Sequence, residues 1–247
     1  MRKDVRLKQI LDLLDQRGAI TAESLSQEFF VSLPTIYRDL RELSRQNLII
    51  HNHGMVQPAR IQTVTTPFDF RRNLNAPAKA AIAKAAAALI RDHSTIFIDA
   101  STTASYLIGE LSRFRNLQVV TNGLVTAVLL ARAGIPTCCL GGTPVENSLA
   151  VGGPRTLELL QRFDVDMMLF SAYGVNSRGI IVDPSEEEVG LRRYALQHTT
   201  SVLLCDESKF GRNSIFQVAP LSEVDYLVTD ARLTAEQAPV RKQVLTV

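Results

Sequence analysis

Several residue types are scarce in this chain of 247 residues, and each scarcity excludes a class of protein. Tryptophan is absent, and only three cysteines occur, Cys138, Cys139 and Cys205, with no CxxC spacing among them. A disulfide framework or a cysteine-ligated zinc site is therefore not expected. All three cysteines lie in apolar, strand-like runs, so we expect buried, reduced thiols in a cytosolic protein.

Long apolar runs and a strong charge of one sign are also missing. No run approaches the roughly 20 residues that span a bilayer, and the charged start of the chain is unlike a signal peptide, so we expect a cytoplasmic protein. Hydrophobic residues make up 46%, which is too many for a disordered chain. The net charge is only +2, and this excess lies within residues 1–60, which hold nine Lys or Arg against seven Asp or Glu.

The segment from Ser32 to Leu43 has the pattern of a DNA-recognition helix. Ser32 can cap the helix through its hydroxyl. Ile36, Leu40 and Leu43 recur at i, i+4 and i+7 and form one apolar stripe. At about 100° per residue, the opposite face holds Pro34, Tyr37, Arg38, Arg41 and Arg45. Arginine matches guanine edges and phosphates, although the same pattern also suits a solvated helix face.

The flanking segments favour the DNA-binding alternative. Residues 2–17 predict a helix that ends at Gly18, with an apolar stripe of Val5, Leu7, Ile10, Leu11 and Leu14. Thr21 is expected to cap a second helix, whose apolar residues are Ala22, Leu25, Phe29 and Phe30. A tight turn then precedes the third helix, which is the order of a helix-turn-helix.

A hairpin is predicted after the recognition helix. Two β-prone runs between Leu48 and Val56 flank Asn52-His53-Gly54. Such a hairpin is the wing of a winged helix. His51 and His53 are then either exposed turn histidines or neighbours of DNA phosphates. No Cys, Asp or Glu accompanies them at ligand spacing, so a metal site is not expected.

These motifs resemble the DNA-binding signature of the DeoR family. They are Arg6-x3-Ile10-x3-Leu14 and Ser32-x2-Thr35-Ile36-Tyr37-Arg38-Asp39-Leu40. Tyr37 stands where the family usually has Arg or His, and the wing lacks the family's nearby Arg. The resemblance implies operator binding by Ser32, Pro34, Thr35, Tyr37, Arg38, Arg41, Arg45 and His53.

The rest of the chain predicts a doubly wound, mostly parallel α/β domain at residues 78–247, after a winged helix-turn-helix at 1–57 and a linker at 58–77. The linker includes a short helix, Phe68 to Asn73. Helical segments are expected near 78–91, 103–113, 123–133, 155–163 and 186–198. Seven apolar runs predict buried parallel strands: Thr95–Asp99, Leu117–Thr121, Pro136–Leu140, Val165–Ser171, Ser201–Asp206, Tyr226–Thr229 and Val244–Val247.

Polar residues and glycines follow four of these strands, where such sheets bind ligands. They are Asp99-Ala100-Ser101-Thr102-Thr103, Asn122-Gly123, Gly141-Gly142 and Asp206 to Arg212. Each alone could be an ordinary cap or turn. Four at one sheet edge predict a site in which hydroxyls and backbone N–H groups hold an anion, and in which glycines let a ligand approach the backbone.

The same motifs resemble the effector domain of the DeoR family, which is related to ribose-5-phosphate isomerase and takes phosphorylated sugars or polyols. The resemblance implies that Asp99 meets ligand hydroxyls, that Ser101, Thr102 and Thr103 hold phosphate, and that Lys209 adds charge. Asn122, Gly141 and Gly142 complete the expected site. Glu188-x3-Arg192 stands where relatives have Glu-x3-Lys.

Two functions are compatible with this organisation. One is a transcriptional regulator of a carbohydrate operon, expected to be a repressor, although the sequence does not separate repression from activation. Its expected partners are operator DNA, a phosphorylated sugar or polyol and further copies of itself in a homodimer or homotetramer, and no cofactor or metal is expected. The other is a sugar-phosphate isomerase with an added DNA-binding domain. Isomerisation needs a carboxylate base, and none follows the run ending at Ser171. Glu186, Glu187 and Glu188 remain candidates for this base, but a run of three acids is more typical of a solvated helix start.

Overall fold

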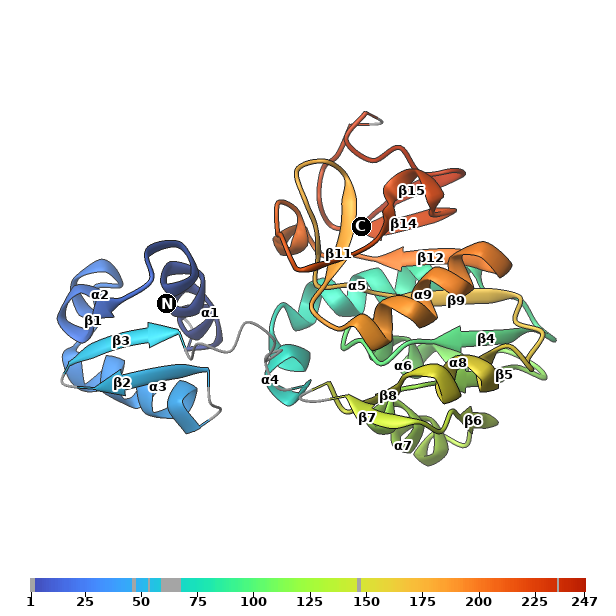
Figure 1. Cartoon of the computed structure of the whole chain (residues 1–247), viewed down its shortest axis with the longest axis horizontal. Coiled ribbons are helices and arrows are strands. Elements are labelled where there is room, and N and C mark those ends of the chain that lie inside the picture. Colours follow the sequence, from blue (N-terminus) through green and yellow to red (C-terminus); the bar gives the residue numbers. More distant parts are fainter. Residues whose placement is uncertain (1–2, 46–47, 53, 59–67, 146–147, 235) are drawn as a thin grey trace. The chain divides into compact units, whose positions relative to one another are not determined.

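The computed structural model describes residues 3–45, 48–52, 54–58, 68–145, 148–234 and 236–247. The chain divides into two compact units, residues 1–74 and residues 75–247 (Figure 1). Each unit has hydrophobic core residues of its own. No helix of the described residues is long and apolar enough to cross a membrane.

The first unit is a winged helix-turn-helix, as predicted. Its helices are α1 (Lys3–Arg17), α2 (Ala22–Glu28), α3 (Leu33–Arg45) and α4 (Phe68–Asn73), and its strands are β1 (Ile20–Thr21), β2 (Ile49–Asn52) and β3 (Met55–Pro58). The strands form an antiparallel sheet in the order β1-β3-β2. Gly18 ends α1 with a left-handed φ of 79°, and the Thr21 hydroxyl caps α2 by accepting the Ser24 N–H at 3.1 Å.

Two residues expected in the core of this unit are instead exposed. Phe30 is 95% exposed because α2 ends before it, and its left-handed backbone (φ 53°) takes it out of the helical periodicity. Val5 is 44% exposed. It precedes Leu7 by two positions, which places it about 200° away around the helix. The core stripe of α1 is therefore Leu7, Ile10 and Leu14.

The second unit contains all seven predicted parallel strands in one sheet. In spatial order they are β15 (Gln243–Thr246), β14 (Tyr226–Thr229), β12 (Thr200–Leu204), β9 (Met167–Phe170), β4 (Thr95–Ile98), β5 (Gln118–Thr121) and β6 (Thr137–Cys139). The helices are α5 (Ala76–Ala86), α6 (Ile108–Leu111), α7 (Leu124–Arg132), α8 (Pro154–Leu160) and α9 (Glu186–His198), with 3-10 turns η1 (Ala87–Leu89), η2 (Ala104–Leu107), η3 (Glu207–Lys209) and η4 (Leu221–Glu223).

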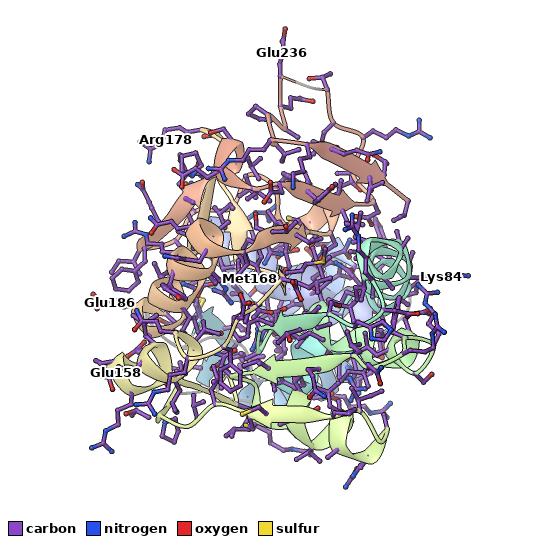
Figure 2. All side chains as sticks on the ribbon, turned by 90° about the vertical axis from the view of Figure 1, so that its right-hand side faces the viewer. Lys84, Glu158, Met168, Arg178, Glu186 and Glu236 are labelled. Atoms are coloured by element: carbon purple, nitrogen blue, oxygen red, sulfur yellow. The ribbon has the colours of Figure 1, made fainter. Side chains whose placement is uncertain are left out.

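Alternate residues of the central strands enter two different cores. Phe97 packs with α8 and α9 residues on one face, whereas Ile96 and Ile98 pack with α5, α6 and α7 residues on the other. The sheet is therefore covered on both faces, which explains why its strands are continuously apolar. Figure 2 shows Met168 of β9 in the interior, and Lys84 and Glu158 at the periphery.

Five short antiparallel strands were not predicted. β7 (Thr143–Val145) pairs with β8 (Ala150–Gly152), and a separate sheet has the order β10 (Gly174–Val175), β11 (Ile180–Asp183) and β13 (Phe216–Pro220). Two to five residues are too few to show the alternation that marks a half-buried antiparallel strand, whereas the main-sheet strands were predicted from continuous apolar runs. The second of these sheets positions Asp183, the last residue of β11.

The prediction of three buried thiols is wrong for two of them. Cys205 is buried, and burial raises its pKa to about 12. Cys138 and Cys139 are exposed, because β6 is the last strand of the sheet. An apolar run does not by itself distinguish an edge strand from a central one.

Candidate functional site

The polar face of α3 is exposed, as its periodicity predicts. Pro34, Arg38, Arg41 and Arg45 are exposed, and Thr35 and Tyr37 are half-buried. On the opposite face Ile36, Leu40 and Leu43 are fully buried. Exposed Ser32 begins the helix: its carbonyl accepts the N–H groups of Thr35 and Ile36, and its hydroxyl lies 2.9 Å from that of Thr35.

A buried ion pair holds α3 against α1. The Arg6 guanidinium donates to the Asp39 carboxylate through Nε at 2.5 Å and through Nη2 at 3.2 Å. Both side chains are almost fully buried. Asp39 therefore lies on the core side of α3, and no carboxylate separates Arg38 from Arg41 on the exposed side.

The wing contacts the recognition helix through an aromatic pair. The rings of Tyr37 and His51 have centroids 5.6 Å apart. Of the two alternatives for His51, the exposed turn residue is wrong, because His51 lies on β2 and is half-buried. Its buried Nε2 has no hydrogen-bond partner among the described residues. Proximity to a DNA phosphate stays a prediction. His53, the other candidate in the wing, lies outside the described residues.

In the second unit, the carboxyl ends of β4, β9 and β12 bring three predicted site residues together. Lys209 Nζ donates to Ser171 Oγ at 2.6 Å and to Thr103 Oγ1 at 3.5 Å. The Ser171 N–H in turn donates to Asp99 Oδ2 at 3.3 Å. Ser171 was not among the predicted ligand-binding residues, although its position at the end of a predicted strand was a signal.

The loop from Ser101 to Thr103 offers backbone donors. The Ser101 N–H donates to Asp99 Oδ1 at 3.0 Å, and Ser101 Oγ accepts the Ala104 N–H at 3.3 Å. Within the described part of the chain, the backbone N–H groups of Thr102 and Thr103 have no hydrogen-bond acceptor. Buried N–H groups are nearly always paired, so these two are exceptions in the structure described here.

Asp99 is engaged within the protein by a residue with no predicted role. Arg192 donates to Asp99 Oδ2 through Nε at 3.2 Å and Nη2 at 2.9 Å. The same guanidinium reaches Asp183 at 2.7 Å and Glu188 at 3.3 Å. All four side chains are buried. Burial alone would lower the pKa of Arg192, but the three carboxylates raise it above its usual range.

This cluster corrects the interpretation of the acidic helix start. Glu186 and Glu187 are exposed as expected, whereas Glu188 is buried and paired with Arg192 one turn later. It also places a carboxylate near the end of β9, since Asp183 accepts the Tyr173 N–H at 3.2 Å. A general base must face the proton that it removes from a substrate. The Asp183 carboxylate instead faces the Arg192 guanidinium, with which it forms an ion pair.

The remaining predicted residues lie toward β8 and α8. Asn122 Nδ2 donates to the Val151 carbonyl at 3.1 Å, and its buried Oδ1 has no partner among the described residues. A Cβ on Gly142 would lie 1.9 Å from Thr156 Oγ1, so this position requires glycine for packing. Gly141 and Gly142 are exposed. Close helix–strand packing thus explains Gly142 without a ligand.

Family comparisons identify both units. Residues 6–61 match the DeoR-like helix-turn-helix domain, and residues 74–231 match the DeoR C terminal sensor domain. The chain belongs to the DeoR family of transcriptional regulators. The DeoR-family glycerol-3-phosphate regulon repressor of Escherichia coli K12 is 33% identical over 94% of this chain and 92% of the relative. The L-fucose operon activator of the same organism is 33% identical over 94% of this chain and 97% of the relative.

The DeoR-family assignment decides between the two predicted functions: the chain is a DNA-binding transcriptional regulator, not an enzyme. Among solved structures, ribose 5-phosphate isomerase A from Methanocaldococcus jannaschii resembles this chain with a TM-score of 0.41 and 19% identity over 55% of each chain.

No group of three or more His, Cys, Asp or Glu in the described ranges could hold a metal ion.

Proposed function

We propose that this DeoR-family regulator represses a carbohydrate transport or catabolism operon, and that a phosphorylated sugar or polyol releases it from its operator. The proposal assigns operator binding to residues 1–57 and effector binding to residues 78–247, with residues 58–77 as the connection. A relative named for a glycerol-3-phosphate regulon supports a phosphorylated ligand, and one named for an L-fucose operon supports a carbohydrate operon as the target.

Operator binding is supported by the exposed arginines of α3. Arg38, Arg41 and Arg45 share one exposed face, and the buried Arg6–Asp39 pair fixes that face outward. One such helix reads only a few base pairs, so a homodimer or homotetramer on repeated half-sites is expected.

Effector binding is supported by the donors around Lys209. Its ammonium lies beside the Thr103 hydroxyl, and the N–H groups of Thr102 and Thr103 lack acceptors among the described residues. This observation favours a phosphate monoester, which offers several acceptor oxygens and negative charge. The effector must bind more tightly to the arrangement that does not bind DNA than to the one that does, because only a difference in affinity shifts the equilibrium.

A mobility-shift titration on DNA from upstream of the gene tests operator binding. Arg38→Ala should weaken binding by about 1–3 kcal/mol, as expected for loss of a bidentate base contact, and the double change with Arg41→Ala should weaken it further. Arg132→Ala, which removes the same charge from the exposed end of α7, is the matched control. Wild-type affinity in the double variant would refute the assignment of α3 as the recognition helix.

A panel of sugar and polyol phosphates tests effector binding in the same assay. At least one should weaken operator binding, and NMR should detect no conversion of it. Release by unphosphorylated sugars alone would refute the phosphate requirement.

A further inference from the structure

Asn75, the first residue of the second unit, is hydrogen-bonded to the loop that contains Lys209. Its Nδ2 donates to Asp206 Oδ1 and to Ser208 Oγ, both at 3.0 Å. Asp206 caps η3, and Ser208 immediately precedes Lys209 within it. The point at which the connection enters the second unit is therefore tied directly to the candidate effector site.

The conformation of Asn75 suits this contact. Its backbone is left-handed (φ 52°, ψ 34°), a region that Asn tolerates better than most residues. Its carbonyl begins α5 by accepting the Lys79 N–H at 3.0 Å, but its side chain makes no capping bond to that helix. The side-chain amide instead joins α5 to the loop after β12.

Asp206 connects Asn75 electrostatically to the candidate phosphate ligand. Burial alone would raise the pKa of Asp206, but Lys209, Ser208, Lys79 and Asn75 together lower it below its usual 3.8. Lys209 therefore stabilises the Asp206 carboxylate in the structure described here. A phosphate bound to Lys209 would compete with Asp206 for that ammonium, because both are anions drawn to one cation.

We propose that Asn75 is the positioning residue through which occupancy of the Lys209 site reaches the connection to the DNA-binding unit. This inference rests on the proposed function. When phosphate engages Lys209, Asp206 and Ser208 move relative to it, and the amide of Asn75 follows them. The chain segment before Asn75 then changes direction, which favours the arrangement with low operator affinity.

Asn75→Gly in the full chain tests the inference, because glycine keeps the left-handed backbone and removes only the amide. Asn116→Gly is the matched control: Asn116 is also left-handed (φ 51°) and lies in the second unit, but its amide contacts His93. Operator affinity is measured by fluorescence anisotropy with and without saturating glycerol 3-phosphate, glucose 6-phosphate, fructose 1-phosphate or inorganic phosphate. Calorimetry measures binding of the same probes.

We expect at least one probe to weaken operator binding by about tenfold or more in the wild type and in Asn116→Gly. In Asn75→Gly the change should be less than about twofold, although probe affinity stays within about threefold of wild type. Asn75→Asp keeps the size of the side chain but opposes Asp206 with like charge, and it should lose release in the same way.

Equal release in the wild type and in both Asn75 variants would overturn the inference and leave the proposed function intact. Failure of the wild type to bind any probe would overturn the proposed effector site, and the inference with it. Loss of probe binding in both Asn75 variants would also overturn the inference, since Asn75 would then belong to the pocket itself.

Discussion

Arg6 of α1 and Asp39 of α3 form a bidentate, buried ion pair, with side chains 8% and 2% exposed. The neighbouring Arg38 is exposed. The pair therefore fixes the rotation of α3 about its axis, and with it the set of side chains that DNA can reach.

Asp39→Ala should destabilise the first unit by about 3–5 kcal/mol, because Arg6 would stay buried without its partner. Urea unfolding of residues 1–74, followed by tyrosine fluorescence, measures the change, because Tyr37 is the only tyrosine in that segment. Lys3→Ala is the control, since Lys3 and Glu42 join the same two helices through an exposed pair. Its effect should be below about 1 kcal/mol. Similar losses in the two variants would contradict the anchoring role of the buried pair.

Lys209→Met should weaken effector binding by about 1.5–3 kcal/mol, or roughly tenfold to more than a hundredfold, because a charge-assisted contact to phosphate is lost. Operator binding belongs to the other unit and should persist. The variant should therefore stay bound to the operator at effector concentrations that release the wild type. Calorimetry with an active sugar phosphate measures the effect. Lys84→Met, an exposed change on α5, should bind the effector normally. Unchanged affinity in Lys209→Met would place the phosphate elsewhere.

Arg192→Met should destabilise the second unit by about 3–5 kcal/mol near neutral pH, because three buried carboxylates lose their common partner. Without the guanidinium, a buried and unpaired carboxylate costs more free energy than a neutral carboxyl group does. The loss of stability should therefore shrink as the pH falls toward about 4. Denaturant titrations across this range measure it.

Arg193→Met is the control for that pH dependence. Arg193 adjoins Arg192 in sequence but donates only to the carbonyls of Gln217 and Val218 in the described contacts. Its effect on stability should not vary with pH over the range in which carboxyls titrate. A parallel pH dependence in both variants would refute the carboxylate explanation.

Thiol alkylation at pH 8 should modify Cys138 first, and Cys205 only after unfolding. Cys138 is exposed. Burial, with a contribution from the neighbouring Cys138, raises the pKa of Cys139, and burial raises that of Cys205 to about 12. Peptide mass spectrometry over time gives the order. Early modification of Cys205 in the native protein would contradict its burial.

The strands of the main sheet were predictable because each is a continuous apolar run, and the recognition helix because its apolar stripe repeats at helical spacing. The exposure of Cys138 and Cys139 at the edge of the sheet was not predictable. These residues differ from those of central strands in their position in space, whereas their local sequence pattern is the same. The turn at Phe30 is a similar case: the helical pattern continued in the sequence beyond the point where α2 ends.

The candidate effector site was predictable only where it follows predicted strands. Asp99, Thr103 and Lys209 were found this way. Arg192 meets Asp99 across 93 positions of sequence, and the contact depends on how α9 packs against the sheet. Asp183 ends a short antiparallel strand with little periodicity, so the cluster of these charges required the three-dimensional structure.

The order of strands in the main sheet has a consequence for synthesis on the ribosome. The three helices α1 to α3 and the three strands of the winged helix-turn-helix all precede residue 59, so this part can fold while the rest of the chain is being made. In the second unit β4, β5 and β6 emerge first, and the other edge of β4 stays unpaired until β9 arrives, with Ile96 opposite Met167. Nascent chains that stop before β9 would thus contain a folded DNA-binding domain and an unpaired edge of β4 that can pair with strands of other chains.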